Sequence, residues 1–101
     1  MALINITEYD ALAVNKVGGP IQAGQEPAIA IQSVTYNASA QSAAFNKRTR
    51  FVRISCNAEA YLVFGENPTA TATTGTNVQA DTPEFFGVVG GQIVAAYDGT
   101  T

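Results

Sequence analysis

Short segments in which apolar and polar residues alternate recur along the whole chain. In residues 50–56, Val52 and Ile54 fall on one face of an extended chain, and Phe51 and Arg53 fall on the other. Turn-forming residues separate such segments roughly every 8–12 residues, and no stretch has the 3.6-residue apolar period of an amphipathic helix. This pattern predicts an all-β domain: a single β-sandwich or a small barrel.

The expected strands are joined by recognisable turns. Asn57 and Ala58 predict a two-residue turn that pairs the strands on either side into a hairpin, and Gly90 and Gly91 predict a second hairpin near the end of the chain. Residues 2–14 predict an extended N-terminal arm, with a short helix capped by Thr7 as the alternative. The other expected strands are residues 28–36, 50–56, 60–64, 78–80, 84–89 and 92–97; the expected turns and loops are residues 17–20, 22–27, 37–44 and 67–77.

Length and composition predict one domain over residues 1–101, with apolar surface left over. The chain is 47% hydrophobic and only 13% charged, and several expected strands are apolar on both faces. In a two-layer sandwich only one face of each sheet meets the core. The second apolar face therefore predicts cover from another part of the chain or from a partner, including self-association.

The charges are unevenly distributed. The formal net charge is −3, yet four of the five positive charges fall within seven residues: Lys47, Arg48, Arg50 and Arg53. One interpretation is a solvated strand entry whose guanidinium groups pair with Glu59 or Glu84, which would stabilise the fold little. The other is docking onto an acidic partner surface through Arg53 and Phe51, residue types enriched at interfaces. The acidic remainder of the chain disfavours nucleic acid.

The composition removes most catalytic chemistry. The absence of histidine excludes a Ser-His-Asp triad and a histidine-ligated metal. Cys56 is the only cysteine, so no internal disulfide can form, and its apolar strand predicts a buried thiol. Turns and strand ends hold four carboxylates without the spacing of an acid pair or a calcium loop: Glu59, Glu66, Asp81 and Glu84. We therefore expect no enzyme, no catalytic residues, no cofactor and no metal.

Nothing in the chain predicts secretion or membrane insertion. The first residues lack the basic start and apolar stretch of a signal peptide. The longest clean apolar runs, residues 60–64 and 93–97, are far shorter than the ~20 residues of a membrane-spanning helix.

Three stretches between residues 45 and 97 carry a resemblance to a known class. They are Thr-Arg-Phe-Val-Arg-Ile at residues 49–54, Ala-Tyr-Leu-Val-Phe-Gly at 60–65 followed by Asn-Pro-Thr-Ala-Thr at 67–71, and the segment from Pro83 to Ala95. Together they resemble small structural proteins of tailed bacteriophages. The resemblance implies a jelly-roll-like β-sandwich in the virion, assembled in the cytoplasm of a bacterial host, and it brings no catalytic signature.

The role that this resemblance implies is decoration or cementing of the assembled phage head, with a head–tail or tail component as the rival. The expected partners are the major capsid protein and further copies of the chain, for instance in a trimer. The residues expected at these contacts come from the N-terminal arm, from the basic stretch and from the strand after it: Leu3, Ile4, Ile6, Tyr9, Arg48, Arg50, Phe51, Arg53 and Tyr61.

A host-glycan-binding sandwich is a further alternative. It would need an aromatic platform, and the tyrosines available for one are Tyr9, Tyr36, Tyr61 and Tyr97.

Overall fold

The computed structural model describes residues 2–14 and 16–99, and for residues 20–22 it describes the backbone alone. The described chain contains no helix, so the all-β prediction is confirmed. The described strands are β1 (Ala2–Tyr9), β2 (Leu12–Val14), β3 (Pro20–Gly24), β4 (Ala30–Tyr36), β5 (Ala40–Gln41), β6 (Phe51–Cys56), β7 (Ala60–Gly65), β8 (Thr76–Val78), β9 (Glu84–Gly87) and β10 (Ile93–Asp98).

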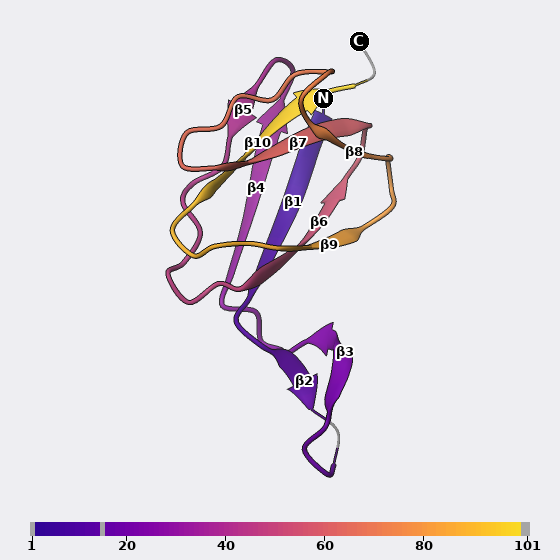
Figure 1. The fold of residues 1–101 in the computed structure, drawn as a ribbon. Helices are drawn as coiled ribbons and strands as arrows, with labels where there is room; N and C mark the ends of the chain where they lie inside the picture. The colour runs from indigo at the N-terminus through magenta and orange to yellow at the C-terminus, as the bar shows by residue number, and fades with distance from the viewer. Residues whose placement is uncertain (1, 15, 100–101) are drawn as a thin grey trace.

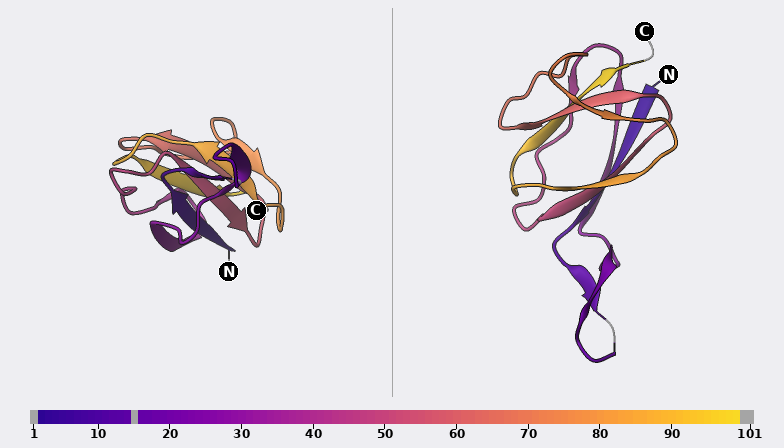
Figure 2. Two further views of the ribbon diagram at one scale, coloured as in Figure 1. Left: turned by 90° about the horizontal axis from the view of Figure 1, so that it is seen from below. Right: turned by 45° about the vertical axis from the view of Figure 1, so that its right-hand side comes forward.

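Two four-stranded sheets pack face to face as a sandwich (Figures 1 and 2). One sheet, here called the β1 sheet, has the order β4-β1-β6-β9, and the other, the β10 sheet, has the order β5-β10-β7-β8. All pairs in both sheets are antiparallel. Antiparallel sheets with one covered face and one outer face produce the two-residue periodicity of the sequence.

The core lies between the two sheets and follows that periodicity. Ile4 and Ile6 from β1, and Val52 and Ile54 from β6, are fully buried. Leu62 from β7 meets them from the other sheet. Every buried side-chain nitrogen or oxygen in the described residues has a hydrogen-bond partner. The core is therefore closed and leaves function to the outer surfaces.

A small hairpin of β2 and β3, here called the arm, projects from one end of the sandwich (Figure 1). Both ends of the described chain lie at the opposite end of the molecule (Figure 2). The projection makes the molecule elongated, with extents of 48 × 26 × 20 Å. The break expected at residues 17–20 covers the tip of this hairpin and the first residue of β3. The loop expected at residues 22–27 contains the rest of that strand from residue 22, and no strand was expected there.

The N-terminal segment is extended, as expected, but most of it is a central strand of the sandwich and not an arm. Ala2–Tyr9 forms the long central strand β1, which pairs with β4 on one side and β6 on the other. Thr7 lies inside this strand, so the helix alternative is also wrong. Ile4 and Ile6 on this strand supply part of the core, which is why the segment lies inside the sandwich.

The two expected hairpins are also wrong, although the strands themselves are present. β6 belongs to the β1 sheet and β7 to the β10 sheet, and the same is true of β9 and β10. Asn57 makes its bonds to β1 instead: its Oδ1 accepts from the Leu3 amide at 2.8 Å, and its own amide donates to the Leu3 carbonyl at 3.2 Å. Gly91 does have the positive φ, 87°, of a tight turn, but that turn carries the chain across to the other sheet.

Candidate functional site

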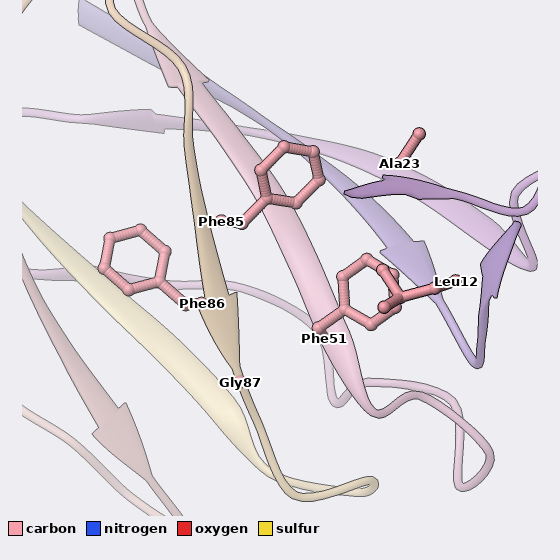
Figure 3. A pocket seen from close by; sticks show the side chains of 6 residues that line it. All are labelled: Leu12, Ala23, Phe51, Phe85, Phe86 and Gly87. Carbon is pink, nitrogen blue, oxygen red and sulfur yellow. The ribbon is translucent and has the colours of Figure 1, made fainter. Parts of the chain in front are cut away.

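An aromatic groove runs along the outer face of the β1 sheet, next to the base of the arm (Figure 3). The Phe51 ring lies 5.2 Å from that of Tyr9, stacked, and 6.0 Å from that of Phe85, tilted. These rings come from β6, β1 and β9, which are neighbours in the sheet. The groove has a volume of about 430 Å³ and is lined by Leu12, Ala23, Phe51, Phe85, Phe86 and Gly87.

The two phenylalanines of β9 point in opposite directions, as Figure 3 shows. Phe86 packs against Phe64 of the other sheet at 5.3 Å and belongs to the interior. Phe85 is 53% exposed on the outer face. Such a large apolar side chain on an outer face, beside the exposed Leu12, marks a surface suited to binding.

The arm is attached to the sandwich through Tyr9. The Tyr9 hydroxyl donates to the Glu26 carboxylate at 2.6 Å, and this hydrogen bond, with burial, raises the pKa of Tyr9. A Cβ at Gly24 would lie only 2.5 Å from the Tyr9 ring, so only glycine permits this approach. The Gln25 amide donates to the Ala11 carbonyl at 3.0 Å and closes the base. The position of the arm relative to the groove is therefore fixed at its base.

A basic loop lies at the same end of the sandwich and is held from inside by Glu8. This side chain is 2% exposed, and its Oε1 accepts from the Asn46 amide at 2.8 Å and from the Thr49 hydroxyl at 2.7 Å. Its Oε2 accepts from the Gln32 side-chain amide at 3.3 Å. The bonds from Asn46 and Thr49 hold both ends of residues 46–49 against the sandwich, and the charged side chains of the loop face outward.

The outer side of this loop forms a shallow hollow with the β9–β10 turn. The hollow has a volume of about 460 Å³, and its apolar part includes Val89, which is 63% exposed. Arg48 pairs with Asp10 at 2.7 Å, and this hydrogen bond lowers the pKa of Asp10. We call the residues that line this hollow the basic end: Lys47, Arg48, Thr49, Arg50, Val88, Val89 and Gly90.

The structure brings together only part of the predicted contact set. Arg48 and Arg50 lie exposed at the basic end, and Phe51 and Arg53 lie on the outer face of the β1 sheet. Tyr9 shares that outer face but is 6% exposed, because the base of the arm covers it. The expected pairing of the arginines with Glu59 or Glu84 is not the ion pair found, which joins Arg48 to Asp10.

The remaining predicted contact residues lie elsewhere. Ile4 and Ile6 are fully buried in the core, so they cannot meet a partner in this fold. Leu3 is half-buried on the outer face of the β1 sheet. Tyr61 lies across from Tyr97 in the β10 sheet, on the other side of the molecule. Ile4 and Ile6 were wrongly predicted as contact residues because residues 2–14 were expected to form an extended N-terminal arm, whereas Ala2–Tyr9 is a central strand.

The four tyrosines do not form one platform. Tyr36 is 3% exposed, donates its hydroxyl to the Ala58 carbonyl at 2.8 Å, and has a pKa raised mainly by burial. Tyr9 lies on the β1 sheet, whereas Tyr61 and Tyr97 form a cross-strand pair in the β10 sheet.

Two of the reactive groups singled out in the sequence, Cys56 and Glu59, have structural roles. Cys56 is a buried free thiol whose pKa is raised mainly by burial, which disfavours the nucleophilic thiolate. Glu59 accepts from the side-chain amides of Asn77 at 3.0 Å and Gln79 at 3.1 Å. Among residues 2–14 and 16–99 no cluster of three or more potential metal ligands occurs.

Two features of the site were missed in the sequence. Glu8 continues the buried face of Ile4 and Ile6 at the two-residue spacing, and a carboxylate in that register was a signal for a buried, hydrogen-bonded group. Leu12 and Val14 share a two-residue spacing that could have indicated an exposed strand.

Comparison of the chain with protein-family models, with curated proteins and with solved structures found no match. No helix of the described residues is long and apolar enough to cross a membrane.

Proposed function

We propose that this chain is a structural protein of a tailed-phage virion that decorates and stabilises the assembled head. The proposal takes its class from the resemblance between residues 45 and 97 and small phage structural proteins. Its docking surface is the basic end, and its partner is an acidic surface of the major capsid protein.

The strand pairing supports a jelly roll, an architecture common in viral shells. Three antiparallel pairs are nested along the chain, β7 with β8, β6 with β9 and β5 with β10, and successive pairs alternate between the two sheets. The fourth pair joins β4 to β1. In this chain β1 lies in the place beside β4 that, by the nesting of the other pairs, a strand following β10 would occupy. We therefore propose a jelly roll whose closing strand is N-terminal.

The single observation that carries the docking surface is the way Glu8 fixes the basic loop. Two of the three hydrogen bonds to the buried Glu8 carboxylate come from Asn46 and Thr49. They hold the loop, so Lys47 and the adjoining Arg50 are displayed without much further loss of backbone entropy on binding. The chain carries a net charge of −3, and four of its five positive charges lie in residues 47–53. Such a charge pattern favours one orientation on an acidic partner.

Empty heads of the phage that encodes the chain provide the test. Adding purified protein should raise the melting temperature of the heads in calorimetry, because a ligand that binds only the assembled lattice stabilises it by mass action. The shift should shrink as salt is raised from about 0.05 to 0.5 M, since exposed charges are screened. An unchanged melting temperature at saturating protein would contradict the proposal.

Matched charge reversals locate the contact. Lys47→Glu and Arg50→Glu should each weaken head binding at least about tenfold, which corresponds to roughly 1.4 kcal/mol. Lys16→Glu changes the net charge equally but lies in the arm, so it should bind like the wild type. Equal losses for all three variants would indicate that only net charge matters. Binding confined to tails in labelled particles would instead support a head–tail or tail component.

A further inference from the structure

Large exposed apolar side chains are concentrated on two adjoining surfaces of the molecule. The described residues expose six of them, and five lie either in the arm or on the outer face of the β1 sheet. The sixth, Val89, lies in the β9–β10 turn at the basic end. The exposed apolar side chains of the arm are Leu12 at 43% exposure, Val14 at 59% and Val17 at 91%. Those on the outer face of the β1 sheet are Ile31 at 66% and Phe85 at 53%.

We propose that these two surfaces bind each other between two copies of the chain. In the resulting two-fold dimer, the arm of each copy lies across the outer face of the partner's β1 sheet and covers the aromatic groove. This contact does not use the basic end, so it does not depend on the proposed function.

The arm cannot cover its own sheet beyond the base. Leu12 and Ala23 reach the groove, but the rest of the hairpin projects away from the sandwich (Figure 1 and the right-hand view of Figure 2). Val14 and Val17 therefore lie beyond the end of their own chain's β1 sheet and do not cover its outer face. Attachment through Tyr9 and Gly24 holds the base of the arm in this position.

A second copy solves the geometry for both surfaces at once. The groove lies where the arm meets the sandwich, so a two-fold axis that passes through it perpendicular to the long axis of the molecule makes the two molecules antiparallel. The partner's sheet then lies alongside the arm, and the reciprocal contact forms by symmetry. Contacts of this kind are self-complementary and close at two subunits.

The dimensions allow a stable contact. Specific interfaces bury about 800 Å² per partner, which is roughly two thirds of a rectangle with the 48 × 26 Å extents of the broad side. Apolar and aromatic side chains at the centre with polar residues around them fit the usual anatomy of an interface. Here Phe51 and Phe85 lie at the centre, and Arg53 lies beside Phe85 in the register.

The oligomeric state of the purified chain tests the proposal. Light scattering after size-exclusion chromatography should give twice the 10.5 kDa chain mass. Val14→Lys in the arm and Phe85→Glu on the sheet should each raise the dimer dissociation constant at least about tenfold. Val89→Glu, an equally exposed apolar position outside both surfaces, should leave the dimer intact. Circular dichroism establishes that each variant is folded.

Mixing the two disruptive variants gives the decisive result. In the mixed dimer one contact pairs the introduced lysine with the introduced glutamate, and the other contact is wild type, so dimer should reform. A wild-type chain that is monomeric at about 100 µM, or that has the mass of a trimer, overturns the proposal. Disruptive variants that remain dimeric, or folded variants whose mixture stays monomeric, overturn it as well.

Discussion

Replacing Glu8 by alanine tests whether one buried carboxylate holds the basic loop in place. The substitution removes the acceptor for three donors: the Asn46 amide, the Thr49 hydroxyl and the Gln32 side-chain amide. Thr49 is itself only 2% exposed, so solvent cannot replace the lost bond without a rearrangement of the loop.

The expected loss of stability is large. Hydrogen bonds to charged groups contribute about 1.5–3 kcal/mol each, and leaving a buried donor without an acceptor costs about 1–3 kcal/mol. Loop relaxation recovers part of this, so we expect Glu8→Ala to lower the free energy of unfolding by about 3 kcal/mol. That is a substantial fraction of the roughly 5–15 kcal/mol that stabilises a typical domain.

Urea unfolding followed by circular dichroism and tyrosine fluorescence measures the effect. With a slope of about 1–1.5 kcal/mol per molar urea, the midpoint should fall by about 2–3 M. Glu8→Gln is the matched control, because its side-chain oxygen can still accept from Asn46 and Thr49, and we expect a loss near 1 kcal/mol. A double-mutant cycle with Thr49→Ala should give a coupling of about 1 kcal/mol or more.

A loss below about 1 kcal/mol for Glu8→Ala, or no coupling to Thr49, would refute this reasoning. It would mean that the basic loop is held by its own backbone turn and not by the carboxylate beneath it.

Three further predictions concern the arm and the core. Gly24→Ala should detach the arm, because the added methyl group would meet the Tyr9 ring. Limited proteolysis checks this: cleavage within residues 10–26 should become faster while the melting temperature changes little. Cleavage at the wild-type rate would contradict the prediction. The raised pKa of Tyr9 means that the folded state favours the neutral phenol, so this contribution to stability is complete below about pH 10 and is lost as pH rises through the folded pKa. Tyr9→Phe should therefore flatten the fall in the free energy of unfolding above about pH 10. A pH profile identical to that of the wild type would argue against the hydrogen bond to Glu26. Cys56 should react with a thiol reagent at pH 8 only through unfolding, so its labelling rate should rise with urea in step with the unfolded fraction; rapid labelling of the native protein would show that the thiol is accessible.

The strands could be predicted from sequence because burial imposes a local period of two. Residues 50–56 alternate in burial as their sequence indicates, and Cys56 falls on the buried side as expected. β3 escaped because it begins with Pro20 and ends with Gly24, residues that indicate turns, and β5 escaped because two residues show no period.

The pairing of the strands could not be predicted in the same way. Alternation says which face of a strand is buried but not which strand lies beside it. Asn57 and Gly91 are genuine turn residues, yet each turn carries the chain between the two sheets instead of closing a hairpin. That distinction depends on contacts distant in sequence, such as the bonds between Asn57 and Leu3.

The candidate site was predictable to a similar extent. Charge clustering identifies Arg48 and Arg50, because exposed charges need no tertiary context to be recognised. The supporting Glu8 and the projecting arm depend on tertiary structure: Glu8 matters because residues 46–49 lie above it, and the arm because Tyr9 holds its base.

Cryo-electron microscopy of empty heads with and without added protein tests the central claim most directly. A decorating protein of this shape should add density on the outer surface that accommodates the 48 × 26 × 20 Å molecule, with the basic end against the shell. Heads that gain no density, or a protein bound with its basic end facing solvent, would contradict the account.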